Sequence, residues 1–96
     1  MKLIPQTRIV HFRNAHDIYI GRPSRWGNPF EIGKDGAWHE VIKKYEEWIR
    51  NQPELLERLG ELEGHTLGCW CKPDKCHGDI LLKLLKERKE NKILKY

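Results

Sequence analysis

The chain has 96 residues, of which 39% are hydrophobic and 33% are charged, and its formal net charge at pH 7 is +4. This length suits a single domain spanning residues 1–96, and the composition excludes an intrinsically disordered chain. The longest aliphatic run, Ile80-Leu81-Leu82, is far too short to cross a bilayer, and residues 1–5 lack the apolar stretch of a signal peptide. We therefore expect a cytoplasmic protein with no membrane partner.

Positive charge gathers in the first and last thirds of the chain. Basic side chains outnumber acidic ones five to one in residues 1–30 and eight to four in residues 65–96, whereas acidic ones outnumber basic ones nine to five in between. Basic ends favour an anionic partner, and we expect a nucleotide or a nucleic acid. Lys and Glu are abundant while Gln is scarce, a composition typical of thermophilic proteins.

The first third of the chain predicts two short strands and a long loop. Residues 8–12 are β-branched and apolar and predict a strand, residues 13–17 predict a turn, and residues 18–20 predict a second strand that Gly21 ends. Residues 21–36 contain four glycines and two prolines, so we expect a loop there. A loop of this length in a small domain is usually functional.

Two helices are predicted next. Asp35 is suited to cap a helix that begins near Gly36, because the apolar side chains that follow recur with a 3.6-residue period. These apolar positions are Trp38, Val41, Ile42, Tyr45, Trp48 and Ile49. A second helix is expected to begin at Pro53, a residue favoured in the first turn, and to continue to about Leu62.

The last third predicts a strand, a helix and a short tail. We expect a strand at residues 65–71, a helix that begins near residues 77–79, and either an edge strand or a frayed end at residues 92–96. The resulting order, β-β-loop-α-α-β-α, predicts a single small α/β domain in which helices pack on a short, partly parallel sheet. Ligands of such sheets bind outside the carboxyl ends of the strands.

All three cysteines of the chain lie in the sequence CWCKPDKCHGD, residues 69–79. Their odd number and their closeness argue against a disulfide framework and for a local site. A Cys₃His zinc site would use the side chains of Cys69, Cys71, Cys76 and His77. In a regular strand, however, the Cα atoms of Cys69 and Cys71 would lie about 6.6 Å apart, whereas two sulfurs on one zinc lie only about 3.8 Å apart. We therefore predict no tightly bound zinc and keep zinc binding by these four residues as the alternative.

Cys76 is the strongest candidate for a reactive group. It lies at or just before a helix N-terminus, beside His77 and near two lysines, and such surroundings lower the pKa of a thiol. We expect Cys76 to act as nucleophile or acid/base with His77 and Asp79 in support, and the N–H groups near Gly78 to hold an anion. Cys69, in the middle of the predicted strand, is expected to be a buried hydrophobic side chain.

A second motif, YIGRPSRWGNPF, spans residues 19–30 of the predicted loop. Arginine binds phosphate through two hydrogen bonds at once, and tryptophan stacks on bases. We therefore expect binding roles for the polar and aromatic residues of this loop. They are Arg22, Ser24, Arg25, Trp26 and Asn28. The alternative is that Trp26 and Phe30 simply anchor the loop to the core.

The two segments together resemble an uncharacterised family of short phage, bacterial and archaeal proteins. Members of that family pair a G-R-P-S-x-W-G-N-P-F loop with a C-W-C-x-P-x-x-C-H-G-D segment. Residues 9–86 of this chain carry both motifs in the same order, with an amphipathic helix between them. The family has no established activity, so the resemblance implies membership without implying a function.

Three functions are compatible with these patterns. The favoured one is a small enzyme of unknown reaction that acts on a nucleotide, a nucleoside or a base in nucleic acid, with the arginine loop for binding and the Cys-His segment for chemistry. The alternatives are a metal-stabilised nucleic-acid-binding module without catalysis and a protein-interaction module. The favoured function requires residues 21–28 and 77–79 to face each other across one pocket, because both segments follow strand ends.

Overall fold

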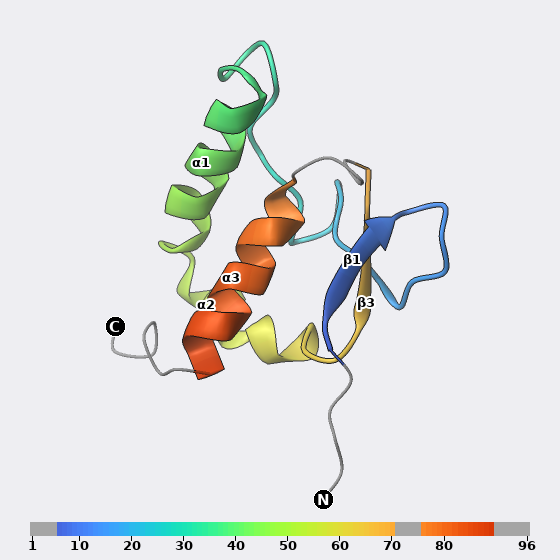
Figure 1. Cartoon of the computed structure of the whole chain (residues 1–96). Coiled ribbons are helices and arrows are strands. Elements are labelled where there is room, and N and C mark those ends of the chain that lie inside the picture. The colour runs from blue at the N-terminus through green and yellow to red at the C-terminus, as the bar shows by residue number, and fades with distance from the viewer. Residues whose placement is uncertain (1–5, 71–75, 90–96) are drawn as a thin grey trace, which may run out of the picture.

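A small parallel sheet with helices on one side organises the residues that the computed structural model describes, 6–70 and 76–89 (Figure 1). The strands are β1 (Arg8–His11), β2 (Ile18–Tyr19) and β3 (Thr66–Cys69). The helices are α1 (Trp38–Ile49), α2 (Pro53–Glu57), the short 3₁₀ helix η1 (Leu59–Glu61) and α3 (His77–Lys89). This order confirms the predicted α/β class. The last residue of the strand expected at residues 65–71 and the whole of the tail at residues 92–96 lie outside the described residues.

β3 is the central strand, and both β1 and β2 run parallel to it. The chain must therefore return from the end of β1 to the start of β2, and residues 12–17 make this return across β3. The ring of His16 in this connection lies so close to β3 that a Cβ on Gly68 would be only 2.6 Å from its Cγ atom. Gly68 thus provides the space in which a short connection can cross the sheet.

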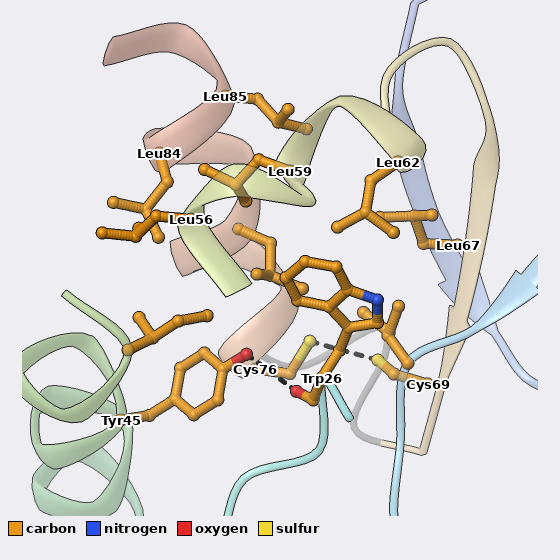
Figure 2. Close-up of a cluster of buried hydrophobic side chains, with 13 residues drawn as sticks. Trp26, Tyr45, Leu56, Leu59, Leu62, Leu67, Cys69, Cys76, Leu84 and Leu85 are labelled. Atoms are coloured by element: carbon orange, nitrogen blue, oxygen red, sulfur yellow. Dashed lines mark hydrogen bonds between the residues drawn. The ribbon is translucent and has the colours of Figure 1, made fainter. Parts of the chain in front are cut away.

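The core lies between the sheet and the helices (Figure 2). α1 and α3 pack against each other and contribute Tyr45, Ile49 and Leu81, all fully buried. On the segment between α1 and β3, Leu56, Leu59 and Leu62 are all buried at a spacing of three residues. Three residues make one turn of a 3₁₀ helix, so the 3₁₀ geometry of η1 directs these leucines inward together.

Two helix boundaries differ from the expected ones. The predicted helix at residues 53–62 is divided into α2 and η1, because the 3₁₀ turn places both Leu59 and Leu62 in the core. Asp35 does not cap α1, since its carboxylate accepts a hydrogen bond from the Glu31 N–H (2.8 Å). The cap is made at Ala37, whose N–H donates to the Glu40 carboxylate (2.8 Å).

Ion pairs join α1 to α3 on the outside of the domain. Arg50 bonds to Glu46 on its own helix and to Glu87 on α3, both at 2.8 Å, and Lys83 bonds to Glu46 at 2.9 Å. The hydrogen bond from Lys83 lowers the pKa of Glu46, and the hydrogen bond from Arg50 lowers the pKa of Glu87. Within residues 6–70 and 76–89, none of these helices is long and apolar enough to span a bilayer.

Candidate functional site

A pocket of about 250 Å³ opens where the loop after β2, the start of α1, the end of β3 and the start of α3 meet. Its apolar walls combine aromatic and aliphatic side chains, namely Tyr19, Phe30, Ile32, Trp38, Val41, Ile42 and Trp70. Its polar and reactive lining groups are Arg22, Asn28, Cys76 and His77. The structure therefore brings the two sequence motifs to one place, as the argument from strand ends predicts.

His77 is the first residue of α3 and lies almost fully buried beside the pocket. Its Nε2 atom is 2.7 Å from the carbonyl oxygen of Ile20. A carbonyl oxygen can only accept, so Nε2 carries the proton and Nδ1 keeps its lone pair. In the described part of the chain Nδ1 has no hydrogen-bond partner.

Burial keeps this imidazole neutral. Desolvation is the main reason that the pKa of His77 lies below its ordinary value, and the positive charge of Arg22 lowers it further. The hydrogen bond to Ile20 acts in the opposite direction. The ring also packs edge-on against Tyr45, with ring centroids 5.1 Å apart. The site thus holds the His77 imidazole in a fixed orientation with its Nδ1 atom unprotonated.

Cys76 and Asp79 form a capping box at the start of α3. The Gly78 N–H donates to Cys76 Sγ (3.2 Å), and the Cys76 N–H donates to Asp79 Oδ2 (3.0 Å). Asp79 accordingly caps the helix and does not line the pocket.

Gly78 does not line the pocket either. It is buried, and a Cβ there would collide with Ile9 of β1. Its N–H donates to the Cys76 sulfur, so it is not open to an anion in this arrangement, and anion binding by this backbone stays a prediction.

The thiols of Cys69 and Cys76 face each other with their Sγ atoms 3.1 Å apart (Figure 2). Both residues are fully buried, which confirms the expectation for Cys69 and places Cys76 at the inner wall of the pocket. Cys71 lies outside the described residues. Among the residues that are described, no three His, Cys, Asp or Glu side chains are arranged to hold a metal. The prediction on zinc therefore stays a prediction.

Arg22 shapes the loop from which it projects. Its Nε donates to the Asn28 carbonyl (2.6 Å) and its Nη2 donates to the Phe30 carbonyl (2.7 Å). Nη1 lies 3.8 Å from Glu31, and about half of the side chain is exposed. The guanidinium has five N–H groups, so it can still bind an anion at the mouth of the pocket.

Two further residues of the loop that were predicted to bind a ligand, Asn28 and Arg25, contact other parts of the protein. Both groups of the Asn28 amide are used, because Nδ2 donates to the Val41 carbonyl (3.1 Å) and Oδ1 accepts from the Phe30 N–H (2.9 Å). Arg25 lies away from the pocket, 4.0 Å from Glu61.

Trp26 and Ser24 lie inside the loop. Trp26 is only 3% exposed and packs in the core, and its carbonyl accepts a hydrogen bond from the Tyr45 hydroxyl (2.7 Å; Figure 2). This burial agrees with the alternative in which Trp26 anchors the loop to the core, and the stacking of Trp26 on a base stays a prediction. The Ser24 hydroxyl is buried without a hydrogen-bond partner in the described segments and does not line the pocket.

Sequence reasoning missed the aromatic walls. The Tyr19 hydroxyl donates to the Arg22 carbonyl (2.9 Å) and accepts from Trp70 Nε1 (2.8 Å), so it joins the loop to the end of β3. A signal was present, because Trp70 follows the buried Cys69 and successive side chains of an extended segment point to opposite faces. Trp38 begins the apolar face of α1 but is 39% exposed, since it lies at the open end of the pocket.

Residues 6–87 match the family described as a domain of unknown function, DUF4326. Two viral proteins are similar to this chain. "Uncharacterized protein R718" of Acanthamoeba polyphaga mimivirus is 35% identical, covering 73% of this chain and 67% of the viral protein. The "uncharacterized 12.4 kDa protein in nrdA-td intergenic region" of Enterobacteria phage T4 is also 35% identical, covering 77% of this chain and 72% of its own length. No solved structure matches the chain.

Proposed function

The chain belongs to the DUF4326 family, and for this member we propose that the pocket binds a nucleotide, a nucleoside or a base in nucleic acid and that Cys76 and His77 act on the bound base. One observation carries the proposal. A neutral imidazole and a thiol lie side by side in the sequence at the inner end of a pocket with aromatic and aliphatic walls, and an arginine lies at its mouth.

The size and the walls of the pocket favour a base as the ligand. Pockets for drug-sized molecules have volumes of about 300–1,000 Å³. The volume of about 250 Å³ suits a smaller, flat group. The indoles of Trp38 and Trp70 offer faces on which such a group stacks, and Arg22 is placed to bind a phosphate that projects outward.

The roles of the two reactive residues follow from their hydrogen bonds. His77 Nδ1 is the proton acceptor, because Nε2 is fixed by the Ile20 carbonyl and burial keeps the ring uncharged. Cys76 is the nucleophile or the acid/base group, since its sulfur accepts the Gly78 N–H at the start of α3 and the residue lines the pocket. Arg22 binds the anion, whereas Asp79 positions Cys76 through the capping box.

The proposal is tested with nucleosides, nucleoside monophosphates and free bases, one compound at a time. We expect chemical-shift changes in the NMR spectrum at His77, Trp38 and Trp70, and turnover of at least one compound by mass spectrometry. His77→Gln and Cys76→Ser should abolish turnover while leaving binding within a few-fold. Arg25→Ala is the matched control, because that arginine points away from the pocket. Shifts that avoid the pocket for every compound contradict the proposal.

One observation favours the metal-stabilised module as a second candidate. The buried thiols of Cys69 and Cys76, 3.1 Å apart, could supply two of the four ligands of a zinc site. The sequence provides a third thiol at Cys71. Elemental analysis of protein purified without chelator decides between the two. About one zinc per chain, lost together with the fold on chelation, would overturn the prediction of no tightly bound zinc and favour the metal-stabilised module over the enzyme.

A further inference from the structure

A group of stacked rings lies at the carboxyl ends of β1 and β3, next to the pocket, with one ring exposed and two half-buried. We call it the aromatic shelf, and it consists of His11, Phe12 and Trp70. The Phe12 and Trp70 rings are 3.9 Å apart between centroids and inclined by only 32°, and His11 meets Trp70 edge-on at 6.3 Å. Trp70 is 60% exposed even with Phe12 against it. Trp70 therefore presents most of the exposed ring surface of the shelf, while the half-buried Phe12 and His11 support it.

The shelf is held rigidly. The Phe12 N–H donates to the Cys69 carbonyl (2.9 Å), which extends the pairing of β1 with β3 by one residue. Trp70 Nε1 donates to the Tyr19 hydroxyl at 2.8 Å. Two aromatic residues from distant parts of the sequence are thus fixed beside each other, as a stacking platform requires.

The charge beside the shelf is positive. The Arg13 guanidinium carbon lies 5.8 Å from the centre of the Phe12 ring. In the part of the chain that the structure describes, Arg13 makes no ion pair with a carboxylate. The nearest acidic residue in the sequence, Asp17, is bonded to the Thr66 N–H and lies 3.5 Å from His65. An arginine beside stacked rings is the combination with which proteins bind single-stranded nucleic acid.

Trp70 belongs to both the shelf and the pocket, since it lines the cavity and stacks with Phe12. We propose that the ligand is single-stranded nucleic acid: one base enters the pocket, the neighbouring base stacks on the shelf, and Arg13 contacts the phosphate next to that base. This inference rests on the proposed function and narrows its substrate class. A duplex is a poor ligand, because its bases are already stacked and paired.

The experiment compares a nucleoside monophosphate with single-stranded DNA and RNA oligonucleotides of two to twelve residues, by fluorescence anisotropy and by competition. We expect affinity to rise at least ten-fold from one nucleotide to two or three, since stacking of each further base contributes this much or more. A duplex of the same sequence should compete at least ten-fold less well. Affinity should also fall as salt rises, because phosphate contacts release counterions.

Phe12→Ala and Arg13→Gln are the decisive variants, because neither residue lines the pocket. Both should weaken oligonucleotide binding about ten-fold and change nucleoside monophosphate binding less than two-fold. Phe12→Leu fills the space under Trp70 without an aromatic ring and should weaken binding like Phe12→Ala, which separates stacking from folding. Arg8→Gln, at the opposite end of β1, is the control.

The outcomes separate this inference from the proposed function. If mononucleotides and oligonucleotides bind equally and the shelf variants change neither, the shelf is not a binding surface, while the pocket proposal stands. If oligonucleotides bind through the shelf but no compound shifts His77, the shelf binds nucleic acid without a base in the pocket. The proposed function then fails, and the arrangement with one base in the pocket fails with it. If mononucleotides shift His77 but no oligonucleotide binds more tightly than they do, this inference fails and the proposed function stands. If neither mononucleotides nor oligonucleotides bind, both fail.

Discussion

The loop after β2 and the start of α3 face each other across one pocket, yet they use their polar groups differently. In the loop, two polar side chains bond to nearby backbone: Arg22 donates to two carbonyls, and Asn28 uses both sides of its amide. At the start of α3, Cys76 and Asp79 cap the helix, but His77 keeps one ring nitrogen free among the described residues. The hydrogen bonds of the loop fix its conformation. Those at the start of α3 fix the backbone and leave the His77 Nδ1 atom unprotonated.

The largest expected effect is on the anchor of the loop. Trp26→Ala should lower the free energy of unfolding by about 3–5 kcal/mol, because it removes a fully packed indole from the core. Trp70→Ala, at an exposed indole, should cost less than about 1 kcal/mol. Urea denaturation followed by circular dichroism measures both. Equal losses for the two variants would contradict the distinction between an anchoring and a surface tryptophan.

The next effect separates two arginines of the same loop. Arg22→Ala should destabilise the fold by about 1–2 kcal/mol, because two carbonyls lose a charged donor that is half-exposed. Arg25→Ala breaks only an exposed pair with Glu61 and should cost about 0.5 kcal/mol or less. The same urea experiment compares them. A loss at Arg25 as large as that at Arg22 would show that the loop is not organised by the Arg22 hydrogen bonds.

His77 should make stability fall in mild acid. Its folded-state pKa lies below the ordinary value of about 6.5, so below that pH the unfolded chain binds more protons than the folded chain. The contribution of this residue is therefore complete above about pH 6.5 and is lost as the pH falls toward the folded-state pKa. Urea midpoints measured between pH 5 and pH 8 test this. His77→Gln should flatten the profile, and an unchanged profile would show that the imidazole is not buried in its neutral form.

The smallest expected effect concerns the two described thiols. Both are fully buried, so iodoacetamide should label Cys69 and Cys76 much more slowly in the folded protein than in urea. Cys76 should react several-fold faster than Cys69, because Cys76 lines the pocket and Cys69 does not. Mass spectrometry of digested protein gives both rates. A ligand that occupies the pocket should remove the difference, whereas a faster Cys69 would contradict the placement of the sulfurs.

Periodicity predicted most of the fold. The apolar positions from Val41 to Ile49 recur as a helix requires, and the order of elements implied a helix-covered parallel sheet. The pattern could not show that β3 lies between β1 and β2, because strand order depends on pairing between residues far apart in sequence. It also could not divide the helix at residues 53–62, since leucines spaced by three suit either helix type.

The candidate site was predicted as a set of residues and only partly in its roles. Motif spacing indicated that Arg22 and His77 would meet. Motif spacing could not show that the Arg22 guanidinium donates to carbonyl groups of its own loop. Nor could it show that the Gly78 N–H donates to the Cys76 sulfur. Trp26 and Trp70 are the same residue type, and only tertiary contacts bury one and expose the other.

The central position of β3 has a consequence for the order in which the protein is assembled. β1 and β2 pair with β3 and not with each other. Arg8 therefore cannot pair before Thr66 has been made, and Ile18 cannot pair before Leu67 has been made. During synthesis β1 and β2 therefore have no partner strand until residues 66–69 have been made. Pairings so distant in sequence slow the search for the native state. The pocket and the aromatic shelf, which both depend on the end of β3, form only in that last step.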